Sequence, residues 1–329
     1  MQKYDLTSFA DIKDKQNICY SVIGNPATIF ILDENENIVK NITELEKENK
    51  NGEQIKIKEA KFSIVDNNGT VINTPSQIAI EEHSPMACFI KNKSHNEYNV
   101  WFFNLDGSQA YMCGHGALAI ASLLHREYKM GQIKLYYDTT KFELNGRKIE
   151  DNSINISVDD NGKVMIQMNM FNYSIVENYK DNEDIIKCRE WLGLEEKDVE
   201  CVICGKEYYD LTFILKDGLK LRTIKPDFEK LAVILAEDKM DVRNLCVSAK
   251  SVENSFDFET RVFCPHDDLN EDIACGSSNL TISRYWHNTT KKNEFKILFP
   301  YNVITDNNVG GIQFIRIEED KIFIGGYCR

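Results

Sequence analysis

The sequence lacks long apolar runs, an excess of basic residues and a glycine-rich phosphate loop. Residues 1–16 alternate charged and polar side chains, so we expect neither a signal peptide nor a membrane-spanning segment. The formal net charge of −13 argues against a nucleic-acid partner, because duplex binding depends on lysine and arginine contacts to phosphate. No glycine-rich loop follows a strand as nucleotide binding requires, so we expect no cofactor.

The ten cysteines point to the compartment and to the chemistry of the protein. Without a secretory signal they favour free thiols in a reducing compartment, which predicts a cytoplasmic protein. Cys201 and Cys204 form a lone C-x-x-C without a second pair or a histidine at zinc spacing, so we predict no metal site. Other cysteines are interpreted as packing residues, namely Cys19, Cys188, Cys246, Cys264 and Cys328.

Two further cysteines each directly precede a glycine-containing turn that opens a helix. They lie in residues 112–116, Met-Cys-Gly-His-Gly, and residues 274–278, Ala-Cys-Gly-Ser-Ser. A thiol at a helix N-terminus lies near unpaired N–H groups and the positive end of the helix dipole, which lower its pKa. The same amides can bind a carboxylate. Two such sites facing each other would place a thiolate and a thiol on opposite sides of a bound amino acid, as inversion at its α-carbon requires.

The first of these segments resembles a known motif. Residues 104–116 contain Asn-x-Asp-Gly-Ser followed by Cys-Gly-x-Gly, which resembles the first cysteine motif of diaminopimelate epimerase. The resemblance implies that Asn104 contacts the substrate and that Cys113 is one of two acid/base thiols. Apolar residues recur at helical spacing after the turn and predict a largely buried helix from Gly114 to about Lys129. The alternative interpretation is a strand, an Asp-Gly turn and a cysteine buried as a small apolar residue.

The second segment resembles a different family with the same fold. Residues 261–278 resemble the second signature of the phenazine-biosynthesis isomerase (PhzF-like) family, and residues 24–26, 211–231 and 322–326 resemble further segments of it. Both resemblances imply one fold class. This is an α+β protein with two pseudo-repeated domains, each a curled, mostly antiparallel sheet around a central helix, known as the diaminopimelate epimerase-like fold.

The chain departs from the PhzF-like pattern at the position of that family's catalytic glutamate. The matching segment is residues 77–90, where the glutamate position falls on Pro85 or Met86, depending on the direction of the count. Neither side chain can carry a proton. The departure favours the two thiols as acid/base groups, with Glu81 or Glu82 as the alternative.

The predicted substrate-binding residues surround the two cysteines. His115 lies inside the first turn, where the PhzF-like family also has a histidine, and either orients the substrate or satisfies loop backbone. Asp272 precedes Cys275 by three residues, and the resemblance implies that it and Glu271 lie at the site. The predicted catalytic residues are Cys113 and Cys275, and the predicted binding residues are Asn25, Asn104, Gly114, His115, Gly116, Asp272, Gly276 and Ser277.

The length of 329 residues suffices for two domains. We place the boundary after residue 135, giving residues 1–135 with Cys113 and 136–329 with Cys275, and the resemblance implies that the last strand returns to the first domain. Helices are expected near residues 182–194 and 227–237, and a hairpin turn at residues 161–162. Residues 36–59 are too rich in Lys, Glu and Asn to be buried, so we expect an exposed insertion.

Together these features predict a cofactor-independent amino-acid racemase or epimerase in which two cysteines transfer the α-proton. Two alternatives stay open: a PhzF-like isomerase with inert cysteines, and a non-catalytic binding protein on the same scaffold. We expect a small-molecule amino-acid substrate, no nucleic-acid partner and no membrane partner, and we leave a homodimer open.

Overall fold

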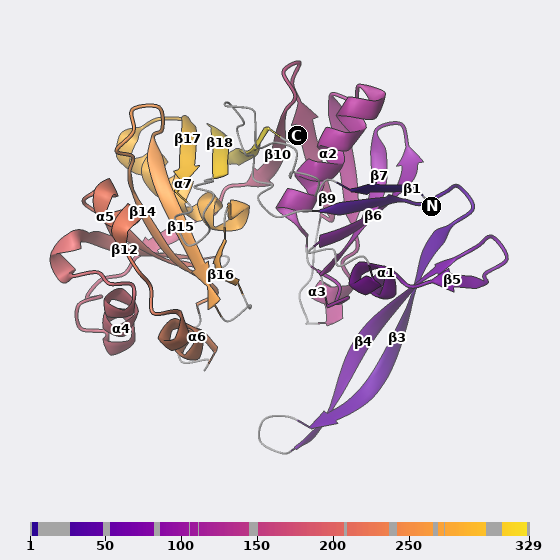
Figure 1. Cartoon of the computed structure of the whole chain (residues 1–329), viewed down its shortest axis with the longest axis horizontal. Helices are drawn as coiled ribbons and strands as arrows, with labels where there is room; N and C mark the ends of the chain where they lie inside the picture. The colour runs from indigo at the N-terminus through magenta and orange to yellow at the C-terminus, as the bar shows by residue number, and fades with distance from the viewer. Residues whose placement is uncertain are drawn as a thin grey trace. The chain divides into compact units, whose positions relative to one another are not determined.

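The computed structural model of the chain forms two compact units (Figure 1). The structure describes residues 2–5, 27–48, 53–81, 86–104, 106–110, 112–144, 151–206, 209–236, 242–265, 269–272, 274–300 and 311–327. Of these residues, those up to Val164 belong to the first unit and those from Met165 onward to the second.

The main sheet of the first unit has the strand order β1-β2-β6-β7-β8-β9. Its neighbouring strands pair in both senses, and three of the five pairs are antiparallel. Helix α2 (Gly114–Tyr128) packs on one face of this sheet and contacts β6 and β9. The strands are β1 (Gln2–Asp5), β2 (Thr28–Ile31), β6 (Met86–Ser94), β7 (Glu97–Asn104), β8 (Gln132–Tyr137) and β9 (Ser153–Val158).

An outer layer covers the opposite face of the same sheet. It consists of β3 (Asn37–Glu48), β4 (Gln54–Val65), β5 (Val71–Asn73) and α1 (Pro75–Glu81). Phe62 of β4 and Ile78 of α1 pack there with Phe89 and Phe103 of the main sheet. A short helix, α3 (Thr140–Leu144), contacts β4. Side chains of β6 and β7 alternate between the two faces of the sheet, so these strands contribute to a hydrophobic core on each face.

The described residues of the predicted insertion, 36–48 and 53–59, are mostly exposed, as expected, and they are more regular than expected. β3 and β4 pair as a long antiparallel hairpin (Figure 1). Most side chains of β3 are exposed. Glu44 lies opposite Lys58, and Glu46 lies opposite Lys56. Such opposite charges stabilise a strand pair that buries little apolar surface.

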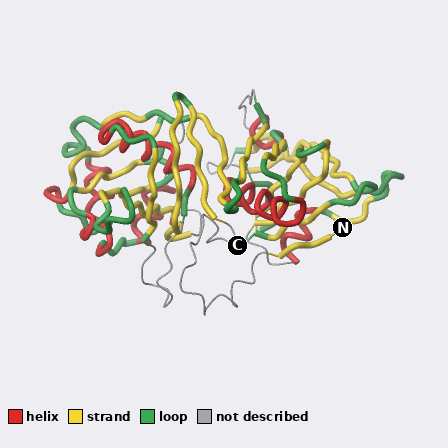
Figure 2. Tube along the Cα trace, turned by 90° about the horizontal axis from the view of Figure 1, so that it is seen from above, coloured by secondary structure: helices red, strands yellow, loops and turns green. Residues whose placement is uncertain are grey.

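The second unit contains a larger, mostly antiparallel sheet around α7 (Gly276–Thr290). Its strands follow the order β10-β19-β18-β17-β15-β14-β13-β12-β11, with β16 beside β15. Strands predominate over helices in both units (Figure 2). The strands are β10 (Lys163–Asn169), β11 (Tyr173–Ile175), β12 (Val199–Gly205), β13 (Leu211–Leu215), β14 (Leu245–Lys250), β15 (Phe258–Cys264), β16 (Leu269–Asp272), β17 (Glu294–Phe299), β18 (Gly311–Glu318) and β19 (Lys321–Tyr327).

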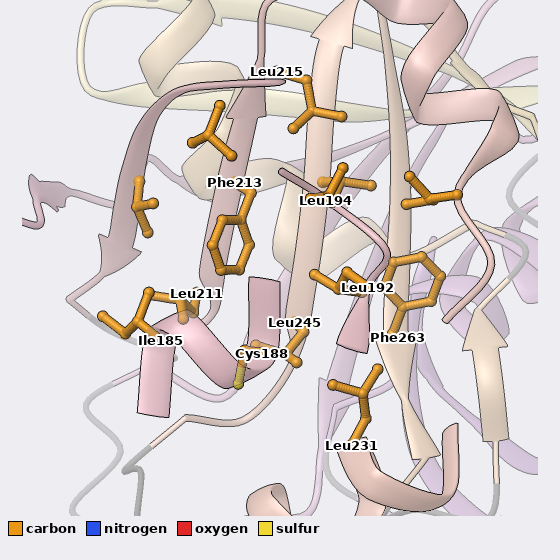
Figure 3. Packing of buried hydrophobic residues seen from close by; sticks show 14 of the residues in the cluster. Ile185, Cys188, Leu192, Leu194, Leu211, Phe213, Leu215, Leu231, Leu245 and Phe263 are labelled. Atoms are coloured by element: carbon orange, nitrogen blue, oxygen red, sulfur yellow. The ribbon is translucent and has the colours of Figure 1, made fainter. Parts of the chain in front are cut away.

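Helix α7 contacts strands that are far apart in that order, which indicates that the sheet curls around it. The helix contacts β11 and β19. Its Trp286 donates a hydrogen bond from Nε1 to Oγ of Ser248 on β14, at 2.9 Å. On the outer face, helices α4 (Glu183–Trp191), α5 (Gly218–Thr223) and α6 (Phe228–Ala236) cover a core in which Cys188 and Leu231 pack with Phe213, Leu245 and Phe263 (Figure 3).

The two central helices are built alike, which confirms the predicted pseudo-repeat and α+β fold class. Both are 15 residues long and have a cysteine at the N-cap. Both end at a lysine in the left-handed region, with φ of 57° at Lys129 and 61° at Lys291. In each case the lysine N–H donates to the carbonyl of a histidine one turn earlier, His125 or His287.

The other predicted elements form with small shifts in their ends. α4 begins after Asn182, whose side chain accepts hydrogen bonds from two backbone N–H groups of the first turn. The expected helix near residues 227–237 is α6. Gly162 has a φ of +78° in the expected turn. Among the described residues, no helix is both long and apolar enough to cross a membrane.

The observed division of the chain differs from the predicted boundary after residue 135. The first unit continues to Val164 because β9 pairs with β8, for example Ser157 with Gln132. The last strand, β19, pairs with β18 and lies next to β10 in the strand order. Its return to the first domain stays a prediction.

Candidate active site

Cys113 is the N-cap of α2 in the first unit, and its side chain is 9% exposed. Its Sγ lies 3.1 Å from Nδ1 of His115, the second residue of the helix. Burial alone raises the pKa of the thiol. The charge and hydrogen bond of His115, together with the backbone N–H groups of Gly116 and His115, outweigh burial and bring the pKa of Cys113 below its ordinary value. The predicted low-pKa thiol is therefore present at this helix.

The Asn-x-Asp-Gly-Ser segment before Cys113 forms a compact turn after β7. Asn104 donates from Nδ2 to Oγ of Ser108 at 3.0 Å, and Asp106 accepts from the N–H of Ser108 at 2.8 Å. Gly107 has a φ of +78°, which favours glycine at this position. The turn directs the chain from β7 back toward Cys113, and contact of Asn104 with a substrate stays a prediction.

Cys275 occupies the corresponding N-cap of α7 in the second unit, and its side chain is 7% exposed. Its Sγ lies 3.4 Å from Oγ of Ser277 and 3.3 Å from Oγ of Ser278. Serine hydroxyls take the place that an imidazole has at the first helix. The second thiol thus has hydrogen-bond partners but no adjacent histidine in its own turn.

A part-buried ion pair between Arg243 and Asp210 lies beside Cys275 and was not predicted from the sequence. Arg243 donates to both carboxylate oxygens of Asp210, from Nε at 2.8 Å and from Nη2 at 2.6 Å. Its Nη2 also lies 3.4 Å from Oγ of Ser278, which in turn contacts Cys275. Asp210 precedes β13 and Arg243 shortly precedes β14, which are adjacent parallel strands. Polar residues at the starts of two apolar strands were the available signal, but the pairing of those strands could not be read locally.

The prediction of a lowered pKa is wrong for Cys275. Burial and then the nearby Asp272 carboxylate raise its pKa to about 11, and Arg243 opposes them only in part. Asp272 also accepts a hydrogen bond from the N–H of Ala274 at 3.0 Å. A helix N-terminus does not make a thiolate favourable where burial and a carboxylate act against it.

The remaining predicted residues fall into three groups. Gly114 and Gly276 begin the two helices, and a Cβ on Gly114 would meet nothing within 4 Å. Gly116 lies against the sheet, where a Cβ would be 2.9 Å from Sγ of Cys88. Asn25, Pro85 and Glu82 lie outside the described residues.

Two further acidic residues considered for the site have partners of their own. Glu271 makes a buried two-bond ion pair with Arg261, with N–O distances of 2.7 Å, which gives it a structural role. Glu81 accepts a hydrogen bond from the side chain of Gln77 on the surface of α1. Within the described parts of the chain, no cluster of three His, Cys, Asp or Glu side chains is arranged to hold a metal ion.

Each cysteine site belongs to its own unit. The structure brings Cys113 together with His115 and Gly116, and brings Cys275 together with Ser277, Ser278 and Asp272. The joint use of both sites for one substrate stays a prediction.

Comparison with known proteins identifies relatives of the chain. A family model described as "Phenazine biosynthesis-like protein" matches residues 74–302. An uncharacterized isomerase of Halalkalibacterium halodurans is 27% identical over 128 residues, which cover 39% of this chain and 44% of that protein. Phenazine biosynthesis-like domain-containing protein 1 of Mus musculus is 24% identical over 203 residues, which cover 60% of this chain and 64% of that protein. The matches thus span less than two thirds of these curated relatives.

The fold of the chain is also found in solved structures. A crystal structure of a phenazine biosynthesis protein of the PhzF family from Enterococcus faecalis is similar with a TM-score of 0.65 and 18% identity. The similarity covers 99% of this chain and 94% of that one. At this identity the comparison shows a shared fold.

Proposed function

This chain belongs to the phenazine biosynthesis-like family, and from that premise we propose that it is a cofactor-independent amino-acid racemase or epimerase that uses Cys113 and Cys275 as its acid/base pair. The observation that carries the proposal is the opposite electrostatic environment of two equivalent thiols. The pKa of Cys113 is lowered beside His115, whereas the pKa of Cys275 is raised to about 11 by burial and Asp272. One group is thus suited to accept a proton and the other to donate one.

The proposed reaction inverts the α-carbon in two proton transfers. The Cys113 thiolate removes the α-proton from one face, and the electron pair of the C–H bond moves toward the substrate carboxylate. The Cys275 thiol then donates its proton to the opposite face of the α-carbon. The enzyme is left with a thiol at Cys113 and a thiolate at Cys275, and exchange with solvent restores the starting form.

Backbone amides at the helix ends are suited to the charge that develops on the substrate. The first residues of α2 and α7 include Gly114, Gly116, Gly276 and Ser277, whose N–H groups lie at the positive ends of the helix dipoles. An enediolate carries more negative charge on its oxygens than the parent carboxylate does. Preorganised donors therefore lower the barrier more than they strengthen binding of the substrate.

The side chains around each thiol support its role. His115 lowers the pKa of Cys113 and so favours its thiolate form before the reaction. Arg243 contacts Ser278 and opposes the rise in the pKa of Cys275, so it stabilises the thiolate formed after proton donation. We assign Asn25, Asn104 and Asp272 to orienting the substrate, as the sequence predicts.

Solvent exchange tests this function. The protein is incubated with single amino acids in deuterated water, and α-deuteration and enantiomer composition are measured. With a cognate amino acid we expect both α-deuteration and racemisation. In Cys113→Ser and in Cys275→Ser the rates of both should fall by about 10²–10⁴-fold, because serine is too weak an acid to ionise near neutral pH. Cys201→Ser, at a half-buried cysteine outside both sites, is the matched control and should retain activity. Near-normal exchange in either active-site variant would overturn the two-thiol mechanism.

A double-bond isomerase with inert cysteines is the second candidate. The family match and the Asp272 carboxylate beside Cys275 favour it. It predicts a shifted double bond in a cyclohexadienyl-type acid, no α-deuteration of amino acids, and activity that survives both cysteine-to-serine changes but not Asp272→Asn.

A further inference from the structure

Each N-cap cysteine has a second buried thiol close to it. In the first unit this is Cys88 of β6, which is fully buried. Its Sγ lies 2.9 Å from the position that a Cβ would occupy on Gly116. The N–H of the same glycine is hydrogen-bonded to the sulfur of Cys113. Both sulfurs therefore contact Gly116, and a side chain at this position would collide with Sγ of Cys88.

We propose that Cys88 is a resolving thiol for Cys113, so that mild oxidation by a hydroperoxide converts the pair into a reversible disulfide instead of destroying the reactive thiol. Both cysteines are free thiols in the structure. The inference concerns the chemistry of Cys113 as a nucleophile and does not require that the chain act on amino acids.

The reaction balances in two steps. The Cys113 thiolate attacks one oxygen of the hydroperoxide, the O–O bond breaks, and a sulfenic acid and an alkoxide or hydroxide form, which takes up a proton. The Cys88 sulfur then attacks the sulfenic sulfur, an S–S bond forms, and the S–O bond breaks with release of water. Two thiols are oxidised by one hydroperoxide, and a dithiol reductant reverses the change by thiol–disulfide exchange.

The negative charge on Cys113 sets the order of these two steps. Burial, and then the nearby charge of Cys113, raise the pKa of Cys88, so Cys88 is a poor target for the peroxide itself. Formation of the sulfenic acid removes the negative charge from Cys113 and with it the second of these two causes. Cys88 thus gains nucleophilic character at the stage at which it is needed.

The second unit contains an equivalent pair, a strand cysteine beside the N-cap cysteine, in a different electrostatic environment. Cys246 of β14 is buried near Cys275, and Ser278 hydrogen-bonds to both sulfurs. Burial raises the pKa of Cys246 well above its ordinary value, and the pKa of Cys275 is about 11. Neither thiol supplies an abundant thiolate near neutral pH, so this pair should react far more slowly with a hydroperoxide.

Disulfide formation would also disturb the first turn of α2. A disulfide needs Cβ atoms about 3.8 Å apart and a sulfur–sulfur bond of about 2.05 Å. Gly116 lies in contact with both sulfurs, so closing the bond displaces the turn that holds His115 and the helix N–H groups. Oxidation is therefore expected to switch off any activity that depends on the Cys113 thiolate.

Peroxide treatment followed by disulfide mapping tests the proposal. The full chain is treated with hydrogen peroxide at neutral pH, its remaining thiols are alkylated, and the digested peptides are identified by mass spectrometry. We expect a cross-linked Cys88–Cys113 peptide that disappears on addition of dithiothreitol. The Cys88→Ala variant should instead accumulate sulfenic acid, trapped by dimedone, and then sulfinic acid at Cys113. Cys246→Ala is the matched control and should form the same cross-link as the unmodified chain.

Two outcomes would overturn the proposal. One is oxidation of Cys113 to the sulfinic acid in the unmodified chain while Cys88 remains alkylatable. The other is a disulfide from Cys113 to a cysteine other than Cys88. The mapping of the unmodified chain decides the question even where Cys88→Ala fails to fold, and it is independent of the amino-acid exchange assay.

Discussion

Nδ1 of His115 lies 3.1 Å from Sγ of Cys113, so a side chain within the first helical turn controls the ionisation of the thiol that precedes the helix. The equivalent residue at the second helix is Ser277, whose Oγ lies 3.4 Å from Sγ of Cys275. A hydroxyl can donate a hydrogen bond but carries no positive charge. The two helix ends share a backbone conformation and differ in this side chain, as well as in the carboxylate beside Cys275.

Replacing His115 with serine, the residue found at the equivalent position of the second helix, should remove most of the lowering of the Cys113 pKa. In His115→Ser, burial continues to raise the pKa of Cys113 while the imidazole no longer lowers it. We therefore expect the pKa of Cys113 to rise, as measured by the pH dependence of its alkylation. His125→Ser, near the other end of the same helix, should leave that titration unchanged. An unaltered titration in His115→Ser would assign the lowered pKa to the helix backbone alone.

Alkylation should discriminate strongly between the two N-cap thiols. With a pKa of about 11, Cys275 has a thiolate fraction on the order of 10⁻⁴ at pH 7, whereas Cys113 has a lowered pKa. We expect iodoacetamide to modify Cys113 at least roughly 100-fold faster than Cys275, as quantified by peptide mass spectrometry. Equal rates for the two would contradict the electrostatic difference between the helix ends.

The activity should depend on pH through both thiols. Base catalysis by Cys113 requires its thiolate, so exchange should increase as the pH rises through the lowered pKa of Cys113. Acid catalysis by Cys275 requires the thiol, so exchange should decline as the pH approaches about 11. Asp272→Asn removes a charge that raises the pKa of Cys275 and should shift the alkaline limb to lower pH. Asp257→Asn, at a partly exposed carboxylate that pairs with Lys292, is the control. An unshifted limb in Asp272→Asn would argue against Cys275 as the acid.

The close packing at Gly116 predicts a stability difference between two glycines of one turn. A Cβ at position 116 would lie 2.9 Å from Sγ of Cys88 and 3.0 Å from the ring of Phe102. Gly116→Ala should therefore reduce the free energy of unfolding by about 1–3 kcal/mol. Gly114→Ala, where the added methyl meets nothing within 4 Å, should change it by less than about 0.5 kcal/mol. Chemical denaturation of both variants gives the comparison, and equal effects would contradict the packing argument.

The buried ion pair between Arg261 and Glu271 predicts a larger loss of stability. Arg261 is 3% exposed, and Glu271→Ala would leave its charge without its carboxylate partner. We expect a loss of about 3–5 kcal/mol of stability. Glu253→Ala removes an exposed partner of Arg222, which retains Glu259, and should cost less than about 1 kcal/mol. Denaturation curves that place the two variants within about 1 kcal/mol of each other would show that the Arg261 charge is compensated elsewhere.

Much of this architecture is encoded locally and was predictable. The helices that follow Cys113 and Cys275 begin at glycine turns and continue with buried residues at helical spacing, which are signals within one short window. Asn182 before α4 is a standard N-cap residue.

The features that were missed depend on contacts between distant segments. The β3–β4 hairpin has a polar sequence, and the pairing of Glu44 with Lys58 becomes apparent only when the strands are aligned. Asp210 and Arg243 meet because β13 and β14 are neighbours in the sheet. The raised pKa of Cys275 likewise follows from burial and from a carboxylate on β16, whereas the helix N-terminus alone predicts the opposite.

The exposed β3–β4 hairpin has a consequence for the colloidal behaviour of the protein. β3 is an edge strand of its three-stranded sheet. It exposes the apolar side chains of Val39 and Ile42 beside the charges of Glu44 and Glu46. A long edge strand is a template for aggregation through intermolecular strand pairing, whereas the net charge of −13 on the chain keeps neighbouring molecules apart. Salt shortens the range of that repulsion from about 10 Å at 0.1 M to about 3 Å at 1 M. Concentrated solutions of this chain should accordingly stay clear at low ionic strength and become turbid as salt is added.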